Sequence, residues 1–309
     1  MSKGVLSNPI FHDADKAREW LEARIWKEGR NCPHCGVVGQ STLMQGKSHR
    51  PGLYQCNACR EPFTVTVGTL YERSKVPLNT WLAATHLMMA SKKGMSALQV
   101  GRMLGLSKKT AWFLCHRIRE SLRENNPELL GGPNKVVEGD ESYVGGKARN
   151  RKGKVPPKEA VFALVERDGK VRSRHVPDVT GKTLGEAIRA QVDPRTYLMT
   201  DEAPVYASIA KGLVHGHGTV NHSIQEYVRG NFWHTNTMEN YFSIMNRGII
   251  GTFHHVSAQH LKRYLAEFDF RYNEREGLGV NDEMRMEGAI PGIVGKRLTY
   301  RRTCREQIA

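Results

Sequence analysis

Two short apolar segments of this chain end in acidic pairs, and a further acidic residue lies in a polar stretch with helical spacing. The pairs are Asp140-Glu141, after Val-Val-Glu-Gly, and Asp201-Glu202, after Tyr-Leu-Met-Thr; the further residue is Glu239. Carboxylate oxygens are the ligands that Mg²⁺ prefers in proteins. Our hypothesis is that Asp140, Asp201 and Glu239 meet in space and hold divalent metal ions, Mg²⁺ or Mn²⁺.

Each of these carboxylates also has a purely structural interpretation. Asp201 could cap the helix that follows it. Asn236 and Glu239, three residues apart, resemble a capping pair at a helix start. Asp140 is harder to explain in this way, because a carboxylate buried in a strand is costly unless it is paired. Taken singly, the three residues leave both interpretations open.

Four polar residues around the third carboxylate are candidates for supporting roles. On a helix, Asn236, Glu239 and Asn246 fall near one face, from which amides could orient metal-bound water or phosphate. His234 and Arg247 lie towards the two ends of the same stretch. We therefore treat Asn236, His234, Asn246 and Arg247 as supporting residues of the site.

The segments that must position these side chains indicate an α/β domain over residues 133–275. Its first strand puts Glu138 and Asp140 on one face and Glu141 on the other, because side chains alternate along a strand. Two strands joined by an Asp-Gly turn follow. After them come a helix, a buried strand that ends at the second aspartate, another helix and the helix of the third carboxylate. This order predicts a mixed sheet.

Four of the six cysteines form two Cys-x-x-Cys pairs, Cys32/Cys35 and Cys56/Cys59, separated by 20 residues. Such pairs supply four thiolates for a tetrahedral Zn²⁺, and short strand-like segments beside them favour a zinc ribbon. Disulfides or free thiols are the alternative, and His34 could compete as a ligand. Because four thiolates leave no open position for water, the predicted zinc is structural.

Residues 73–127 have the pattern of a helix-turn-helix module. Ser96 and Ser107 are expected to cap two helices that are joined by a turn at Gly105. Lys108, Lys109 and Thr110 begin the second helix, which is the end that enters the major groove of DNA in such motifs. The alternative is an ordinary three-helix packing module. Trp112, Ile118 and Leu122 are expected to face inward.

The chain is strongly basic, with a net charge of +15 and a pI near 9.7. This balance favours a polyanionic partner, although a basic protein without a nucleic-acid role would look the same. A basic segment after the first strand could hold a phosphate backbone or merely aid solubility; it contains Arg149, Arg151, Lys152 and Lys154. No window approaches about 18 apolar residues, and no signal-peptide core is seen, so we expect a cytoplasmic protein without a membrane partner.

The organisation expected from these patterns is multidomain. Its parts are an N-terminal helix (1–29), a zinc ribbon (30–72), a helix-turn-helix-like DNA-binding module (73–127), the α/β domain (133–275) and a basic C-terminal tail (276–309).

Several segments together resemble the DDE-type insertion-sequence transposases that carry a zinc ribbon. The resemblance covers nearly the whole chain. The residues that carry it are Val137-Glu-Gly-Asp-Glu-Ser-Tyr-Val-Gly-Gly146, Thr200-Asp-Glu202, His234-Thr-Asn-Thr-Met-Glu-Asn240, Arg247-Gly-Ile-Ile-Gly-Thr-Phe-His-His-Val256 and His260 through Asn273.

The resemblance implies a ribonuclease H-like (retroviral-integrase-like) catalytic domain in which Asp140, Asp201 and Glu239 hold two metal ions. Water would free a 3′-hydroxyl at the end of the element, and this hydroxyl would then attack target DNA in the same site. The implied partners are double-stranded DNA, as element ends and target, and further copies of the chain when it assembles on DNA ends.

The sequence departs from the family pattern at Asn246, seven residues after Glu239, where many relatives have a basic residue, usually Lys. Either the adjacent Arg247 takes over, or contact with the DNA end is weaker. Two alternatives to a transposase remain open. One is a DNA-binding regulator derived from a transposase, and the other is a structure-specific nuclease of the same fold.

Overall fold

The computed structural model describes residues 4–125, 127–146, 157–210, 212–220, 228–229 and 233–299, apart from the side chains of Ala207, Val220, Val228, Arg229 and Trp233. The chain divides into two compact units. We call Met1–Arg123 with Gly279–Ala309 the ribbon unit, and Glu124–Leu278 the sheet unit.

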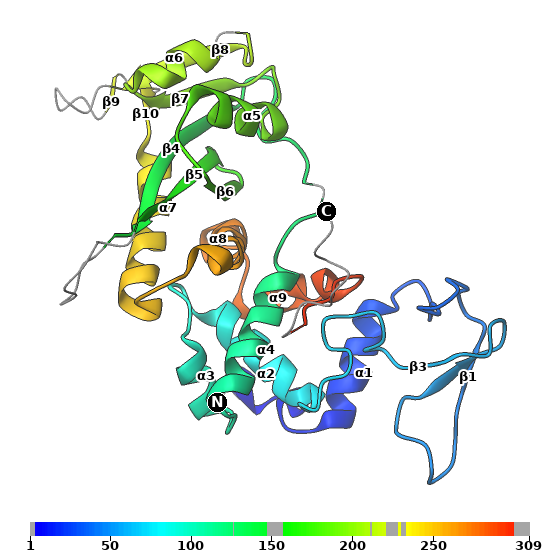
Figure 1. The fold of residues 1–309 in the computed structure, drawn as a ribbon. Helices are drawn as coiled ribbons and strands as arrows, with labels where there is room; N and C mark the ends of the chain where they lie inside the picture. The colour runs from blue at the N-terminus through cyan, green and yellow to red at the C-terminus, as the bar shows by residue number, and fades with distance from the viewer. Residues whose placement is uncertain are drawn as a thin grey trace. The chain divides into compact units, whose positions relative to one another are not determined.

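The ribbon unit consists of a small antiparallel sheet and a group of helices (Figure 1). Its elements are the short helices η1 (Val5–Ser7), η2 (Pro9–Phe11) and η6 (Pro291–Ile293), the helices α1 (Ala14–Ile25), α2 (Leu78–Ala90), α3 (Ala97–Met103), α4 (Lys108–Ser121) and α9 (Asp282–Ala289), and the strands β1 (Ser41–Leu43), β2 (Tyr54–Cys56) and β3 (Pro62–Phe63).

An aromatic cluster packs the small sheet against the end of α1. The ring of Trp26 meets those of Tyr54 and Phe63 edge-on, at centroid distances of 5.6 and 6.1 Å. The hydroxyl of Tyr54 donates to Glu22 on α1 at 3.3 Å. These few rings are nearly all of the apolar core that the ribbon possesses.

Two serines start α3 and α4 as predicted. The Oγ of Ser96 accepts from the amide of Gln99 at 3.2 Å, and the Oγ of Ser107 accepts from the amide of Thr110 at 3.2 Å. Gly105 takes a positive φ of 65° between the two helices, which suits glycine because it lacks a Cβ.

One inward-facing residue of α4 was predicted wrongly. Ile118 and Leu122 are buried, but Trp112 is 36% exposed and packs its ring against that of His116, 4.2 Å away. Helical spacing indicates which residues share a face, but it does not fix where the edge of the buried face falls.

The C-terminal segment differs from the predicted basic tail, because residues 281–298 fold into the ribbon unit. Arg285 on α9 donates to the carbonyl of Met89 at 3.0 Å. The ammonium of Lys296 donates to the carbonyls of Glu120 and Ser121, at the end of α4, at 3.2 and 3.1 Å. Apolar side chains of this segment are buried with it, namely Met286, Ala289, Ile290 and Ile293.

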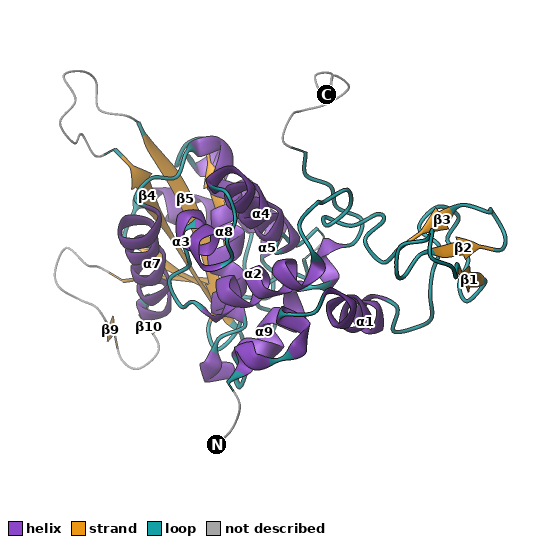
Figure 2. Ribbon diagram, turned by 90° about the horizontal axis from the view of Figure 1, so that it is seen from below, coloured by secondary structure: helices purple, strands orange, loops and turns teal. Residues whose placement is uncertain are grey.

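The sheet unit is built around one five-stranded sheet (Figure 2). Its strands are β4 (Val136–Gly145), β5 (Lys158–Glu166), β6 (Val171–Val176), β7 (Tyr197–Asp201), β8 (Gly216–Val220) and the separate pair β9 (Val228–Arg229) and β10 (Trp233–His234). Its helices are α5 (Gly181–Gln191), α6 (Pro204–Ala210), α7 (Asn236–Gly248), η4 (Ile249–Phe253), α8 (Ala258–Asn273) and η5 (Glu276–Leu278).

The strand order in this sheet is β6-β5-β4-β7-β8. β4, β5 and β6 pair antiparallel, whereas β7 pairs parallel with both β4 and β8. The predicted mixed sheet is therefore confirmed. β8 was not predicted, because its Gly-His-Gly start lacks the alternation of a typical strand.

Helices cover both faces of the sheet (Figures 1 and 2). Side chains of β5 alternate between two cores: Val161, Ala163 and Val165 pack with α7 and α8, whereas Phe162 and Leu164 pack with α5 and α6. The side of the sheet on which any strand residue lies can thus be read from its register with β5.

Among the residues that the structure describes, no helix is both long enough and apolar enough to span a lipid bilayer.

Candidate active site and zinc-ribbon site

Asp140 lies on β4 and faces the core that contains α7 and α8. It is paired across the ladder with Ala163, and cross-strand partners share a face. Its neighbour Glu141 points to the opposite face, as predicted, where it accepts a hydrogen bond from the hydroxyl of Tyr206 on α6.

Asp201 ends β7, the strand next to β4, and lies level with Asp140. The last pair in this parallel ladder is Glu138 with Met199. Each aspartate lies two residues beyond that pair, so both lie on the same face of the sheet. The two aspartates therefore stand on adjacent strands, on the side of α7, at the point where those strands stop pairing.

Helix α7 crosses β4 beside these aspartates, and two contacts fix its course. The amide of Met238 donates to the Oε2 of Glu138 at 2.9 Å, and the Nδ2 of Asn246 lies 3.4 Å from the Oγ of Ser142. Glu138 and Ser142 flank Asp140 on its own face of β4. Glu239, in the first turn of α7, is thereby carried to the face of the two aspartates.

The capping interpretation of Asn236 and Glu239 does not describe this helix. The residue before α7 is Thr235, and its side chain makes no capping hydrogen bond. Asn236 is the first residue of the helix rather than its cap. The Oδ1 of Asp201 accepts from the amide of Ala203 at 3.1 Å; Ala203 precedes α6, so this bond turns the chain ahead of the helix and is not a bond to one of the helix amides.

The electrostatics of Asp140 show that several acidic groups influence it. The pKa of Asp140 is raised to about 7, mainly by burial and also by the charges of Glu141, Asp201 and Glu239, against one hydrogen bond from the amide of Glu141 at 2.7 Å. Clustered carboxylates repel one another unless a cation lies between them. Hard oxygen donors of this kind fit Mg²⁺ or Mn²⁺.

The supporting residues are placed unequally. Asn246 reaches β4, and the Nδ1 of the half-buried His234 lies 3.3 Å from the Oε1 of Glu138. Arg247 is exposed and turns back along its own helix to the Oγ of Ser243 at 2.7 Å. Asn236 is exposed. The structure thus brings two of the four towards the strand of Asp140.

A pair of charged residues that the sequence did not suggest lies beneath the site. Glu138 is fully buried, and its Oε1 accepts from the Nε of Arg167 at 2.7 Å. Arg167 also donates to the main-chain carbonyl of His234 at 2.6 Å. Strand alternation predicted that Glu138 shares the face of Asp140, but nothing local to Glu138 indicates its partner on the β5–β6 hairpin.

The expected DNA-contacting residues fall into two groups. Lys108 and Lys109 are exposed at the start of α4, and the hydroxyl of Thr110 is hydrogen bonded to that of Ser107 at 2.9 Å. The basic loop residues Arg149, Arg151, Lys152 and Lys154 lie outside the described residues.

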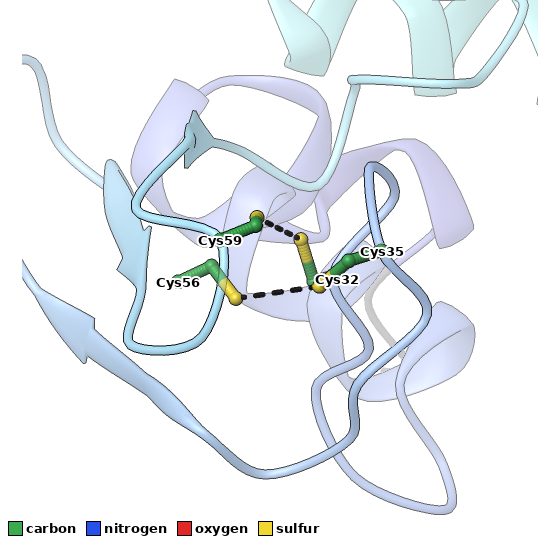
Figure 3. Close-up of side chains that lie close together, drawn as sticks. All are labelled: Cys32, Cys35, Cys56 and Cys59. Atoms are coloured by element: carbon green, nitrogen blue, oxygen red, sulfur yellow. Dashed lines mark hydrogen bonds between the residues drawn. The ribbon is translucent and has the colours of Figure 1, made fainter.

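The four ribbon cysteines converge closely (Figure 3). The Sγ atoms of Cys32 and Cys59 are 3.7 Å apart, those of Cys35 and Cys56 are 3.6 Å apart, and all four lie within 4.8 Å of one another. Thiolates about 2.3 Å from a tetrahedral Zn²⁺ would be separated by roughly 3.8 Å. The described cysteines are free thiols rather than disulfides, and the arrangement fits zinc.

Hydrogen bonding in the second knuckle favours a thiolate. The main-chain amides of Cys59 and then Ala58 lower the pKa of Cys56, which falls to about 6. Within the described residues, the oxygens of Asp140, Asp201 and Glu239 do not converge as closely as the four cysteine sulfurs do.

Comparison with known proteins places both units in one family. Residues 129–273 match the family described as the ISXO2-like transposase domain, and residues 12–61 match the transposase zinc-ribbon domain. Both matches are to domains of transposases, one in each unit. The first match spans Asp140, Asp201 and Glu239, and the second spans the four cysteines, so the predicted resemblance is confirmed.

One similar protein also comes from a transposable element. This chain is 27% identical over 282 residues to the "Uncharacterized protein in transposable element ISH50" of Halobacterium salinarum. The alignment covers 84% of this chain and 91% of that protein. The match to a transposase domain implies DNA as a partner, and the ribbon match with its four thiols supports a structural zinc.

Proposed function

We propose that the chain is a DNA transposase that cleaves phosphodiesters at element ends and joins the freed 3′-hydroxyl to target DNA. Asp140, Asp201 and Glu239 would be its catalytic carboxylates. The observation that carries the proposal is that Asp140 and Asp201 stand level on adjacent parallel strands, on the face crossed by the helix of Glu239, inside a transposase-domain match.

The fold supports a ribonuclease H-like domain in this proposal. Three antiparallel strands are continued by two parallel strands, with helices on both faces, and the acidic residues lie on the central strands β4 and β7. Asp140 is positioned by its pairing with Ala163 of β5, whereas Glu239 lies on a helix that is hydrogen bonded to Glu138 of the sheet.

The chemistry assigned to the site depends mainly on positioning. Asp140, Asp201 and Glu239 would hold two Mg²⁺ or Mn²⁺ ions, and bound ions would supply activation of the attacking oxygen and stabilisation of the leaving oxygen. Asp140 and Asp201 would set the ligand positions on the sheet, and Glu239 would complete them from α7. His234 and Asn246 would orient groups around these carboxylates.

Binding is assigned to the ribbon unit and to the net charge of +15. We propose that α3 and α4 form a helix-turn-helix module in which Lys108, Lys109 and Thr110 approach double-stranded DNA. The serine caps and the turn at Gly105 support this assignment. Because transposition joins two ends, we further propose that copies of the chain assemble on DNA.

The test is incubation of the purified chain with a duplex that carries the terminal inverted repeat, in the presence of Mg²⁺. Wild type should nick the repeat end and yield strand-transfer products. Asp140→Asn and Asp201→Asn should lose at least about 100-fold in rate, because each removes a charged oxygen ligand of the proposed metal ions. Glu202→Gln, a neutralised neighbour, is the matched control and should cleave.

Three outcomes separate the alternatives. Equal cleavage by wild type and both aspartate variants would show that the site is elsewhere. Cleavage without strand transfer would favour a nuclease of the same fold. Sequence-specific binding without cleavage would favour a regulator derived from a transposase.

A further inference from the structure

A cavity of about 230 Å³ in the ribbon unit is lined by several arginines. Three segments far apart in sequence meet there: the chain after the ribbon, helix α4 and the C-terminal segment. Arg73, Arg117 and Arg297 come one from each segment, and Glu72 is the acidic residue of the lining. The charge of these four side chains is therefore 3 − 1 = +2.

Arg117, on α4, is half-buried and lacks a carboxylate partner within the described residues. Its Nε donates to the carbonyl of Leu298 at 3.3 Å and its Nη1 to the carbonyl of Glu72 at 3.4 Å, and its guanidinium lies 4.7 Å from the ring centroid of Phe113. Burial lowers the pKa of Arg117, the charge of Arg297 lowers it further, and the charge of Glu72 only partly opposes them. An anion between the two guanidiniums would relieve both effects.

The acid in the lining is already engaged. Glu72 accepts from the amide of Gly68 at 3.0 Å and pairs with Arg73 at 3.4 Å. Arg297 is exposed and makes no ion pair or hydrogen bond with any residue of the described chain. Two guanidiniums thus remain for an external anion, and planar guanidinium groups suit phosphate oxygens.

The cavity continues a face of α4 that begins at the proposed DNA-contacting end of the helix. Lys109, Phe113 and Arg117 follow one another at spacings of four residues and lie along one side of α4. Eight residues of helix rise about 12 Å. A DNA strand lying along this side would bring phosphates past Lys109 and then past the cavity.

We propose that this cavity binds a phosphate of the DNA backbone and forms a DNA contact separate from that of Lys108, Lys109 and Thr110. The guanidinium groups of Arg117 and Arg297 bind the phosphate, and the ring of Phe113 positions the guanidinium of Arg117. The contact carries no base specificity, because it touches only the backbone. The inference rests on the proposed function only in taking DNA as the partner.

The experiment measures duplex binding by fluorescence anisotropy at several salt concentrations, using the full zinc-loaded chain and a duplex of arbitrary sequence. Arg297→Gln should weaken binding several-fold at low salt, and it should lower the log–log salt slope by roughly 0.9, the value of one phosphate contact. Arg117→Lys should lose less affinity than Arg117→Gln. Arg189→Gln, an exposed charge loss on α5, is the matched control and should leave the slope unchanged.

Competition with inorganic phosphate provides a second test. At constant ionic strength, phosphate should compete with DNA more effectively in wild type than in Arg297→Gln, because the variant lacks one of the two guanidinium groups. Since Arg297 is exposed and makes no hydrogen bond or ion pair with any described residue, its substitution should keep the fold, and zinc content checks this.

Two results would overturn the inference. If Arg297→Gln shows the same salt slope as wild type while Asp140→Asn still loses cleavage, the phosphate site is wrong and the proposed function is unaffected. If DNA binding by wild type does not depend on salt, both the phosphate site and the proposed DNA-binding function are contradicted.

Discussion

Two carboxylates on the same side of the sheet show how single residues divide between structure and chemistry. Asp269 on α8 is half-buried, and it accepts three hydrogen bonds, from the amide and hydroxyl of Ser173 at 2.8 and 2.7 Å and from the hydroxyl of Tyr241 at 2.6 Å. Asp140 accepts only the amide of Glu141 among the described residues. A half-buried carboxylate with so few hydrogen bonds is costly unless it binds a ligand, whereas Asp269 ties α8 to β6 and α7.

The first prediction concerns Asp269 and pH. Burial raises its pKa to about 7, above the value of about 3.9 for an unfolded chain, so the folded state binds more protons between these values. Its contribution to stability is therefore fully present below about pH 4 and is lost as the pH rises through about 7.

Calorimetry at pH 5 and pH 8 checks this prediction. Wild type should lose up to roughly 2–3 kcal/mol from this group between pH 5 and pH 8, whereas Asp269→Asn should lose much less across the same window. An unchanged pH dependence in Asp269→Asn would contradict the assignment.

At the scale of elements, α7 depends on a buried ion pair for its position. Glu138 receives the amide of Met238 and the guanidinium of Arg167, and Arg167 also holds the main chain at His234. Helix α7 and the β5–β6 hairpin are thus both hydrogen bonded to Glu138 on β4, two residues before Asp140. The position of Glu239 follows from these contacts.

The second prediction is that Glu138→Ala destabilises the protein by roughly 3–5 kcal/mol, because it leaves the charge of Arg167 buried without its partner. Glu138→Gln should lose less, since its amide oxygen can still accept from Met238. Urea denaturation measures the stability, and DNA cleavage reports on Glu239. If Glu138→Ala unfolds at the wild-type urea concentration, the ion pair does not hold α7.

At the scale of the whole molecule, each unit depends on a different source of order. The sheet unit has two hydrophobic cores, one on each face of its sheet. The ribbon has little beyond Tyr54, Phe63 and the adjoining Trp26, and a core of that size needs a metal to fold. Loss of zinc should therefore disorder the ribbon and spare the sheet unit.

The third prediction uses cysteine variants. Cys56→Ser should lose bound zinc, as measured by elemental analysis, together with the near-ultraviolet circular dichroism of the Trp26 cluster. Cys115→Ser, at a buried cysteine of α4, is the control and should retain zinc. Stoichiometric zinc in Cys56→Ser would contradict a four-thiolate site.

Features set by local chemistry were predicted from sequence, and those set by distant contacts were not. The serine caps of α3 and α4, the four-cysteine group and the opposite faces of Asp140 and Glu141 each depend on a few neighbouring residues. The Asp-Gly turn also forms, with Asp168 at a φ of 57°. By contrast, α9 packs against a helix nearly 200 residues earlier, since Arg285 and Met89 are 196 positions apart. Periodicity does not reveal such partners.

The central claim is that Asp140, Asp201 and Glu239 form one metal-dependent site. The most direct test is calorimetric titration of Mn²⁺ into zinc-loaded wild type, into Asp140→Asn, Asp201→Asn and Glu239→Gln, and into the control Glu202→Gln. The fourth prediction is that wild type and Glu202→Gln bind Mn²⁺ alike, and that each of the other three variants binds at least about tenfold more weakly, because each loses a charged oxygen ligand. Wild-type Mn²⁺ affinity in any of these three variants would contradict the claim for that residue.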